Sequence, residues 1–200
     1  MQKLHLSTTN PHKVEKLTQL FSRYFPEIVV ADRSITIDEN GSTFRENAEI
    51  KALAASKHHH GYAAATDGGV LIPALGNKWN SLLTKRFIGR DDATDFDRMD
   101  ALLDLMKDKT GDERAIIWNE AIALAKDGTV IFSCQVEGDR GMLQTSYNKS
   151  QYQKGIWQCT LTCYPQFQNK NFVELNEEER QYGEMSWRRL GEAIDDFMKG

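Results

Sequence analysis

Apolar residues recur at helical spacing in several stretches of the chain. Val14, Leu17, Leu20 and Phe21 share one helix face, so we predict a helix from Pro11 to about Tyr24. The same spacing predicts a helix over 96–107 and a last helix that starts near Ser186. These helices would each bury one apolar face against the rest of the molecule.

Short apolar runs between the helices predict β-strands. We expect strands over residues 4–7, 27–31 and 155–161, and a polar loop over 138–154. Asp127-Gly128 predicts a hairpin turn between apolar stretches at 113–125 and 129–136. A further small-residue strand, Ala63-Ala64-Ala65, is expected to end at the turn Asp67-Gly68-Gly69.

The first predicted helix begins directly after the first strand. Asn10 followed by Pro11 has the pattern of an N-cap and a proline at the first helical position. A helix N-terminus in this place offers free amides to an anion. Lys13 is unfavourable for the helix dipole there, so we expect an anionic ligand beside it. The alternative is a solvated lysine.

Two acids stand at starts or ends of predicted elements. Thr43 and Glu46 fit a capping box, in which Glu46 reaches back to the amide of Thr43, and capping alone would justify Glu46. Asp67 lies where a strand is expected to meet a loop, the usual place for chemistry in open α/β sheets. The simpler interpretation of Asp67 is an Asp-Gly turn between core strands.

Composition narrows the class of protein. The chain has 200 residues, 40% hydrophobic and 27% charged, which suits one globular domain over residues 1–200. A net charge of −4 disfavours a general nucleic-acid binder. Three cysteines without zinc-type spacing predict free thiols, and no stretch predicts a membrane span, so we expect a cytoplasmic protein. His58-His59-His60 are expected to be surface residues at a helix end.

Several motifs in register resemble one known family. Thr8, Asn10 and Lys13 match an opening Thr-x-Asn-x-x-Lys, and residues 43–48 match Thr-Phe-x-Glu-Asn-Ala, followed by Lys51. Residues 65–70 correspond to Ala-Asp-Asp-Ser-Gly-Leu, and residues 85–89 to Ala-Arg-Tyr-x-Gly. With these motifs the chain resembles the inosine-triphosphate pyrophosphatase family, which removes deaminated purine nucleotides.

The match is weaker at other positions. Thr66 and Gly68 replace an acid and a serine of the family motif. The purine-binding Phe-Gly-Tyr-Asp-Pro segment corresponds to residues 155–160, and Ser-His-Arg corresponds to Ser186-Trp187-Arg188. Indole can donate but not accept a hydrogen bond, so the exchange at Trp187 would change how a base is read.

The resemblance implies a fold and a chemistry. We expect an α/β fold with a mixed central sheet flanked by helices, and two lobes with a nucleotide cleft between them. The implied reaction is Mg²⁺-dependent hydrolysis of a nucleoside triphosphate to monophosphate and pyrophosphate, in a homodimer. Asp67 would be the general base or a metal ligand, together with Glu46 as metal ligand. The implied substrate-binding residues are Thr8, Asn10, Lys13, Lys51, Gly68, Arg86, Trp157, Trp187 and Arg188.

Two alternatives to this function stay open. The chain could be a nucleotide-binding protein of the same fold with weak or no hydrolysis, or a pyrophosphatase for a different base. Trp157 and Trp187 could also be core aromatics with a satisfied indole N–H rather than base-stacking residues.

Overall fold

The computed structural model describes residues 2–30, 37–84, 86–90 and 92–200. Its α-helices are α1 (Pro11–Phe21), α2 (Phe44–His59), α3 (Asp95–Leu105), α4 (Trp157–Leu161), α5 (Glu177–Gly183) and α6 (Met185–Lys199). Its strands are β1 (Lys3–Leu6), β2 (Glu27–Val30), β3 (Tyr62–Leu71), β4 (Ala115–Lys126), β5 (Thr129–Leu143), β6 (Thr162–Tyr164) and β7 (Lys170–Asn171). Several 3₁₀ turns connect these elements.

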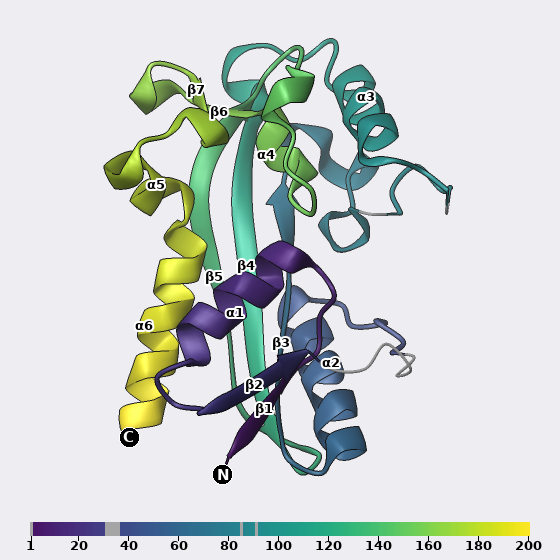
Figure 1. Ribbon diagram of the computed structural model, residues 1–200. Helices are drawn as coiled ribbons and strands as arrows, with labels where there is room; N and C mark the ends of the chain where they lie inside the picture. The colour runs from purple at the N-terminus through teal and green to yellow at the C-terminus, as the bar shows by residue number, and fades with distance from the viewer. Residues whose placement is uncertain (1, 31–36, 85, 91) are drawn as a thin grey trace. The chain divides into compact units, whose positions relative to one another are not determined.

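Within the described ranges, seven strands form one sheet in the order β2-β1-β3-β4-β5-β6-β7 (Figure 1). β1 runs parallel to β2 and β3, whereas β6 is antiparallel to β5 and β7. α1 and α2 provide the helical crossovers that parallel neighbours need. The predicted class, α/β with a mixed central sheet flanked by helices, is confirmed.

Chain contacts divide the protein into two compact units. Unit 1 consists of Met1–Gly68, Glu120–Val136 and Ser186–Gly200, and unit 2 consists of Gly69–Asn119 and Glu137–Met185. β3, β4 and β5 each contribute residues to both units. The assignment of residues 1–200 to one pyrophosphatase-like domain, and the cleft between two lobes, stay predictions.

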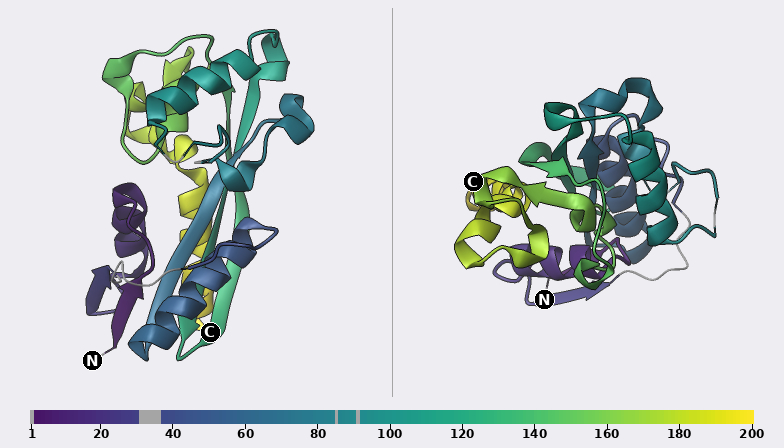
Figure 2. Two further views of the ribbon diagram at one scale, coloured as in Figure 1. Left: turned by 90° about the vertical axis from the view of Figure 1, so that its right-hand side faces the viewer. Right: turned by 90° about the horizontal axis from the view of Figure 1, so that it is seen from above.

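The core of unit 1 joins α1 and α6 to the central strands. Leu17 and Phe21 of α1 pack with Leu190 and Ile194 of α6, and all four side chains are at most 1% exposed. Tyr24 donates a hydrogen bond to Asp195 of α6 at 2.7 Å. α2 lies on the other side of the strands from α6 (Figure 2). Its small buried residues, Ala48, Ala52 and Ala55, let the helix approach the sheet closely.

Unit 2 has its own core. Met99 and Leu102 of α3 pack with Trp79, Ile116 and Trp157 in one buried cluster. A second cluster contains the buried residues Cys159, Tyr164, Phe172 and Leu175. Each unit therefore buries apolar side chains independently, as the helical spacing in the sequence predicts.

Local signals predicted the helix boundaries and the hairpin well. Asn10 caps α1, with Pro11 at its first position, and α6 starts one residue before Ser186. Asp127 and Gly128 adopt positive φ angles of 48° and 80° and join β4 to β5, which confirms the predicted hairpin. Residue 31, at the end of the second predicted strand, lies outside the described residues.

Three predicted elements were wrong. Asp67-Gly68-Gly69 lies inside β3, which continues to Leu71, rather than in a turn at its end. Residues 157–161 form helix α4, not a strand, and β5 extends to Leu143 through the first part of the predicted loop. In each case contacts with residues further away in the sequence decide the secondary structure. The local amino-acid composition does not predict these contacts.

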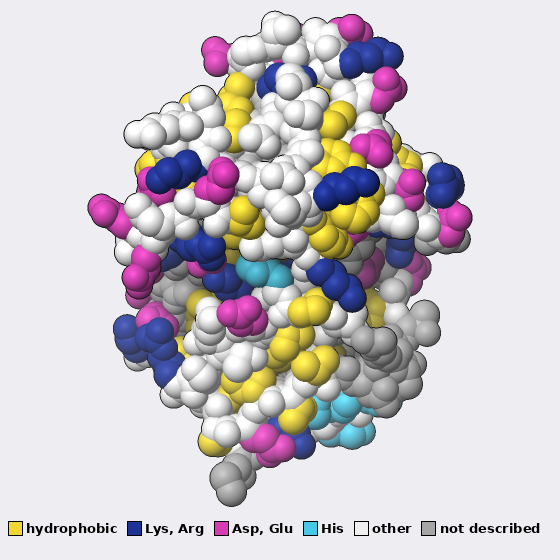
Figure 3. Space-filling view, turned by 45° about the horizontal axis from the view of Figure 1, so that its top comes forward, with side chains coloured by type: hydrophobic (Ala, Val, Ile, Leu, Met, Phe, Trp, Pro, Cys, Tyr) yellow, Lys and Arg dark blue, Asp and Glu magenta, His cyan; other side chains and the backbone are white. Residues whose placement is uncertain are grey.

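The free thiols predicted from the sequence are confirmed. Cys134, Cys159 and Cys163 are free thiols. Acidic and basic side chains are interspersed over the face drawn in Figure 3. None of the helices within the described ranges has the length and apolar character needed to cross a membrane.

Candidate active site

The first part of the candidate site is the N-terminus of α1. The Asn10 side chain accepts hydrogen bonds from the amides of His12 at 3.0 Å and Lys13 at 3.5 Å. The Thr8 hydroxyl accepts from the Asn10 amide at 3.3 Å. The first turn of α1 contains no acidic residue. The helix dipole therefore places partial positive charge at this end of α1, where an anion could bind.

Lys13 has a partner that sequence reasoning missed. Its Nζ lies 2.7 Å from Oε1 of Glu120 on β4, and the two side chains are 18% and 9% exposed. Burial raises the pKa of the Glu120 carboxyl, and the Lys13 charge opposes that shift. A signal was present in the sequence, because Glu120 is an acid directly before the apolar run Ala121-Ile122-Ala123-Leu124-Ala125. Sequence alone did not show which residue would face it.

Asp67 forms the second part of the site. Leu6 is paired with Ala64, so Asp67 lies beyond the end of β1, at the same end of that strand where the segment leading to α1 begins. Its carboxylate accepts hydrogen bonds at 3.1 Å from Asn47 Nδ2 and from Lys51 Nζ. Both donors belong to α2 and lie one helical turn apart, so that helix fixes the carboxylate from one side.

Lys51 and Asn47 are themselves held in place. Lys51 makes a second ion pair with Glu39 at 3.2 Å, and its side chain is 12% exposed. Asn47 is 3% exposed, and its carboxamide oxygen accepts a hydrogen bond from the Gly41 amide at 2.9 Å. Asn47 is part of the motif over residues 43–48, which indicated no role for it. In the structure it orients Asp67.

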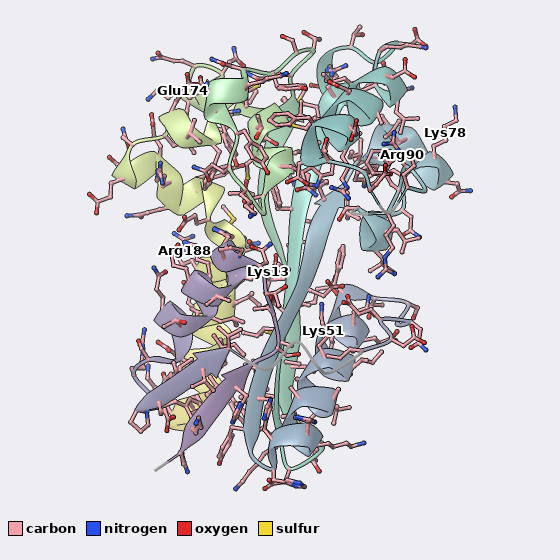
Figure 4. All side chains as sticks on the ribbon, turned by 45° about the vertical axis from the view of Figure 1, so that its right-hand side comes forward. Lys13, Lys51, Lys78, Arg90, Glu174 and Arg188 are labelled. Atoms are coloured by element: carbon pink, nitrogen blue, oxygen red, sulfur yellow. The ribbon has the colours of Figure 1, made fainter. Side chains whose placement is uncertain are left out.

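The charges of these groups act on one another. Besides Lys13, the Lys51 ammonium lowers the pKa of Glu120, whereas the Asp67 carboxylate raises it. Lys13, Lys51, Asp67 and Glu120 therefore form a charge network of two ion pairs in unit 1. Figure 4 labels the two lysines on α1 and α2. The Thr66 hydroxyl, next to Asp67, is buried and has no hydrogen-bond partner in the described part of the chain.

The model of the Ham1 family matches residues 4–197, nearly the whole chain. The chain belongs to the Ham1 family. The resemblance to the inosine-triphosphate pyrophosphatase family, which the motifs indicated, is thereby confirmed.

Curated relatives of this Ham1 chain are named as enzymes. A dITP/XTP pyrophosphatase of Legionella pneumophila (strain Paris) is 34% identical over 139 residues, which cover 66% of this chain and 69% of the relative. A dITP/XTP pyrophosphatase of Photorhabdus laumondii is 38% identical over 122 residues, which cover 60% of each protein. A solved HAM1 protein of Coxiella burnetii has a TM-score of 0.76 at 24% identity, covering 98% of this chain and all of the other, and shows the same fold.

Glu46 lies in the first turn of α2 of this Ham1 chain. Thr43 caps the helix as predicted, but the Glu46 carboxylate reaches Ser42, accepting from its amide and its hydroxyl at 2.6 Å each. These bonds, first the hydroxyl and then the amide, lower the pKa of Glu46. The carboxylate is exposed and ionised. Its role as a metal ligand stays a prediction.

The donor set fits a magnesium ion shared with a substrate. Within the described ranges, no group of three or more His, Cys, Asp and Glu side chains is arranged to hold a metal. Mg²⁺ commonly uses only one or two carboxylates and takes its other ligands from water and substrate phosphates. Asp67, held by two donors, provides such a side chain near the N-terminus of α1.

Two predicted substrate residues lie on α6 in unit 1. Trp187 is 8% exposed and packs into the core cluster with Leu17 and Leu190, and its ring lies edge-on to His12 at 6.0 Å between centroids. Arg188 is exposed at the start of α6 (Figure 4) and is 3.9 Å from Glu192. The contact between His12 and Trp187 brings the starts of α1 and α6 together.

Two further predicted substrate residues, Trp157 and Arg86, belong to unit 2. Trp157 is 3% exposed and stacks on Phe87 at 6.2 Å between ring centroids. Arg86 is exposed, and its amide donates to the Leu83 carbonyl at 2.8 Å. Lys85, in the same motif, lies outside the described residues. Gly68 follows Asp67 in β3 and, like Gly69, does not adopt a positive φ.

Proposed function

We propose that this Ham1-family chain hydrolyses a nucleoside triphosphate to the nucleoside monophosphate and pyrophosphate. The observation that carries the proposal is the Asp67 carboxylate, which Asn47 and Lys51 hold just past the end of β1. A fixed carboxylate at the carboxyl end of a parallel strand is well placed to act on a ligand bound at the following helix. The names of the curated relatives support the same reaction.

In the proposed reaction Asp67 takes a proton from the attacking water. The water oxygen forms a bond to phosphorus of the α-phosphoryl group, and the bond to the bridging oxygen breaks so that pyrophosphate leaves. Lys13 and Lys51 offset the charge of the phosphates, while Thr8 and Asn10 shape the backbone that faces them.

We assign Mg²⁺ to this site with Asp67 and Glu46 as the residues that hold it. The metal would supply neutralisation of a substrate that carries about four negative charges. The carboxylates of this chain contribute oxygen ligands, which Mg²⁺ prefers, and leave positions for water and phosphate. The ionised state of Glu46, favoured by its bonds to Ser42, suits this role.

A deaminated or otherwise modified purine is the base we propose, because relatives are named dITP/XTP pyrophosphatases. Arg86 and Arg188 would contact the base or the phosphates, and Gly68 would allow close approach to β3. Trp157 and Trp187 would line the base-binding end. Their burial also suits core aromatics.

A cytoplasmic homodimer is part of the proposal, and free thiols at all three cysteines support the compartment. The second candidate function is nucleotide binding with weak or no hydrolysis. The exchange of the first acid of the family motif for Thr66 favours it, because Asp67 is then the only carboxylate of that motif.

Hydrolysis of a panel of triphosphates tests the proposal. Inosine, xanthosine, their deoxy forms, the ordinary purines and the pyrimidines are each incubated with the protein and Mg²⁺, and products are separated by anion-exchange chromatography. We expect monophosphate and pyrophosphate in equal amounts, with deaminated purines fastest. Release of phosphate with diphosphate would contradict the bond assignment, and absence of any product would favour the binding protein.

A further inference from the structure

The Lys13–Glu120 pair is an unusual feature for an anion site. A lysine binds phosphate most strongly when no other anion pairs with its ammonium group. Nζ of Lys13, however, lies 2.7 Å from a carboxylate that is 9% exposed. Attraction between charges grows as burial lowers the local dielectric constant. The Glu120 carboxylate therefore strongly reduces the positive charge that Lys13 adds to the N-terminus of α1.

The second lysine of the network is occupied in the same way. Lys51 lies 3.1 Å from Asp67 and 3.2 Å from Glu39. Two ammonium groups thus face three carboxylates, so the set is neutral or acidic before any ligand binds. A polyphosphate that arrives alone meets no net positive charge from these side chains. A polyphosphate that arrives with a divalent cation brings the missing charge with it.

Glu120 differs from the other carboxylates in its position. Burial raises the pKa of its carboxyl, and the Asp67 charge raises it further, so its ionised form depends on Lys13 and Lys51. When a phosphate draws Lys13 away, the Glu120 carboxylate loses its nearest compensation and faces the phosphate directly. Repulsion of this kind acts on a bare anion and is relieved by a cation placed between the two oxygens.

We propose that Glu120 is a specificity-determining residue that makes the phosphate end of this site accept a polyphosphate only together with a divalent cation. The inference rests on the proposed function, because it assigns Lys13 to the phosphates. Through Glu120, the site discriminates against metal-free polyphosphates and selects their metal complexes. We call this preference the selection rule.

Calorimetric titration with inorganic pyrophosphate tests this rule without hydrolysis and without a base. Dissociation constants are measured at one pH with Mg²⁺ and with EDTA, for wild type and for Glu120→Gln. The glutamine keeps an oxygen that can accept from Lys13 but removes the charge. We expect the variant to bind metal-free pyrophosphate on the order of tenfold more tightly, with the affinity for the magnesium complex changed much less.

Glu27→Gln is the matched control. Glu27 also lies 2.7 Å from a lysine of unit 1, Lys3, but that pair is exposed, at 52% and 42%. We expect Glu27→Gln to bind pyrophosphate like wild type under both conditions. Circular dichroism checks the fold of each variant. Glu120→Leu, which also lacks the charge, gives the same test if the glutamine variant does not fold.

Each outcome is informative. If Glu120→Gln leaves both affinities unchanged, strengthens both equally or weakens both, the selection rule is wrong while the pyrophosphatase proposal stands. If wild type binds no pyrophosphate with or without Mg²⁺, Lys13 is not at a phosphate site, and the proposed function fails along with the inference.

Discussion

At the scale of single residues, burial decides which groups carry unusual protonation. Asp139 of β5 is 2% exposed and accepts a hydrogen bond from the Tyr164 hydroxyl at 2.7 Å. Desolvation raises the pKa of Asp139 to about 7, and the Tyr164 hydrogen bond only partly opposes this shift. An acid that is protonated more readily in the folded than in the unfolded protein makes stability depend on pH.

We predict that ionisation of Asp139 lowers the free energy of unfolding as pH rises. Its folded pKa of about 7 lies above the unfolded value of 3.8, so its contribution is fully present below 3.8 and is lost as pH rises through 7. Between pH 5 and pH 8, wild type should lose about 2 kcal/mol more of its unfolding free energy than Asp139→Asn does, by urea unfolding. Equal losses in the two proteins would contradict the pKa shift.

Residue-scale sequence signals succeeded when cause and effect were close in the chain. Asn10, Thr43 and the pair Asp127-Gly128 act on amides or turns within a few positions, and all of them do what the sequence predicts. Glu120 was missed because its partner Lys13 is 107 positions away. Burial of an acid is predictable from an apolar strand, but the identity of its counter-ion depends on the fold.

At the scale of elements, helix α2 holds the Asp67 side chain of strand β3 in place. Asn47 and Lys51 hold Asp67 from one face of α2, while the glycines after Asp67 continue the strand. Two glycines in sequence predicted a turn, because a turn is where glycine is needed most often. Sheet pairing overrode this preference, and neither glycine uses a positive φ.

The short helix α4 was predicted as a strand, and one side chain explains the difference. The Asn171 amide nitrogen donates to the carbonyls of Cys159, Thr160 and Thr162 at 2.9–3.1 Å, and Asn171 is fully buried. The Thr162 amide also donates to the Cys159 carbonyl, and the Asn171 side chain adds a buried donor for all three carbonyls at this helix end. β-Branched and aromatic residues at 156–161 gave no sign of this donor, which follows ten or more positions later.

We predict that Asn171→Ala destabilises the protein by about 2–4 kcal/mol, because it removes the donor of three buried hydrogen bonds to the end of α4. Asn148→Ala is the control, since Asn148 is exposed and its side chain accepts one bond, from the Ser150 amide at 3.0 Å. That variant should lose no more than about 1 kcal/mol. Urea unfolding measures both, and similar midpoints for the two variants would show that Asn171 has no such role.

At the scale of the whole molecule, the sequence identified the family but did not show which charged side chains pair in the site. The motifs in the first half identified the Ham1 relationship, and the family model matches residues 4–197. The second half, where α4, β6 and the Asn171 contacts lie, departs from the family motifs, and most errors of prediction fall there. A family motif can be recognised from residue types alone. Changed side-chain packing, such as the Asn171 contacts, can be recognised only from the three-dimensional structure.

We propose that Asp67 drives hydrolysis of a nucleoside triphosphate, and the rate of pyrophosphate release by Asp67→Asn is the decisive measurement. Asp195→Asn is the control, because Asp195 also accepts from a cation, Arg23 at 2.8 Å, and belongs to the same unit. With inosine triphosphate and Mg²⁺ we predict a fall in kcat of about 10²–10⁴-fold for Asp67→Asn and a wild-type rate for Asp195→Asn. Full activity of Asp67→Asn would contradict the claim.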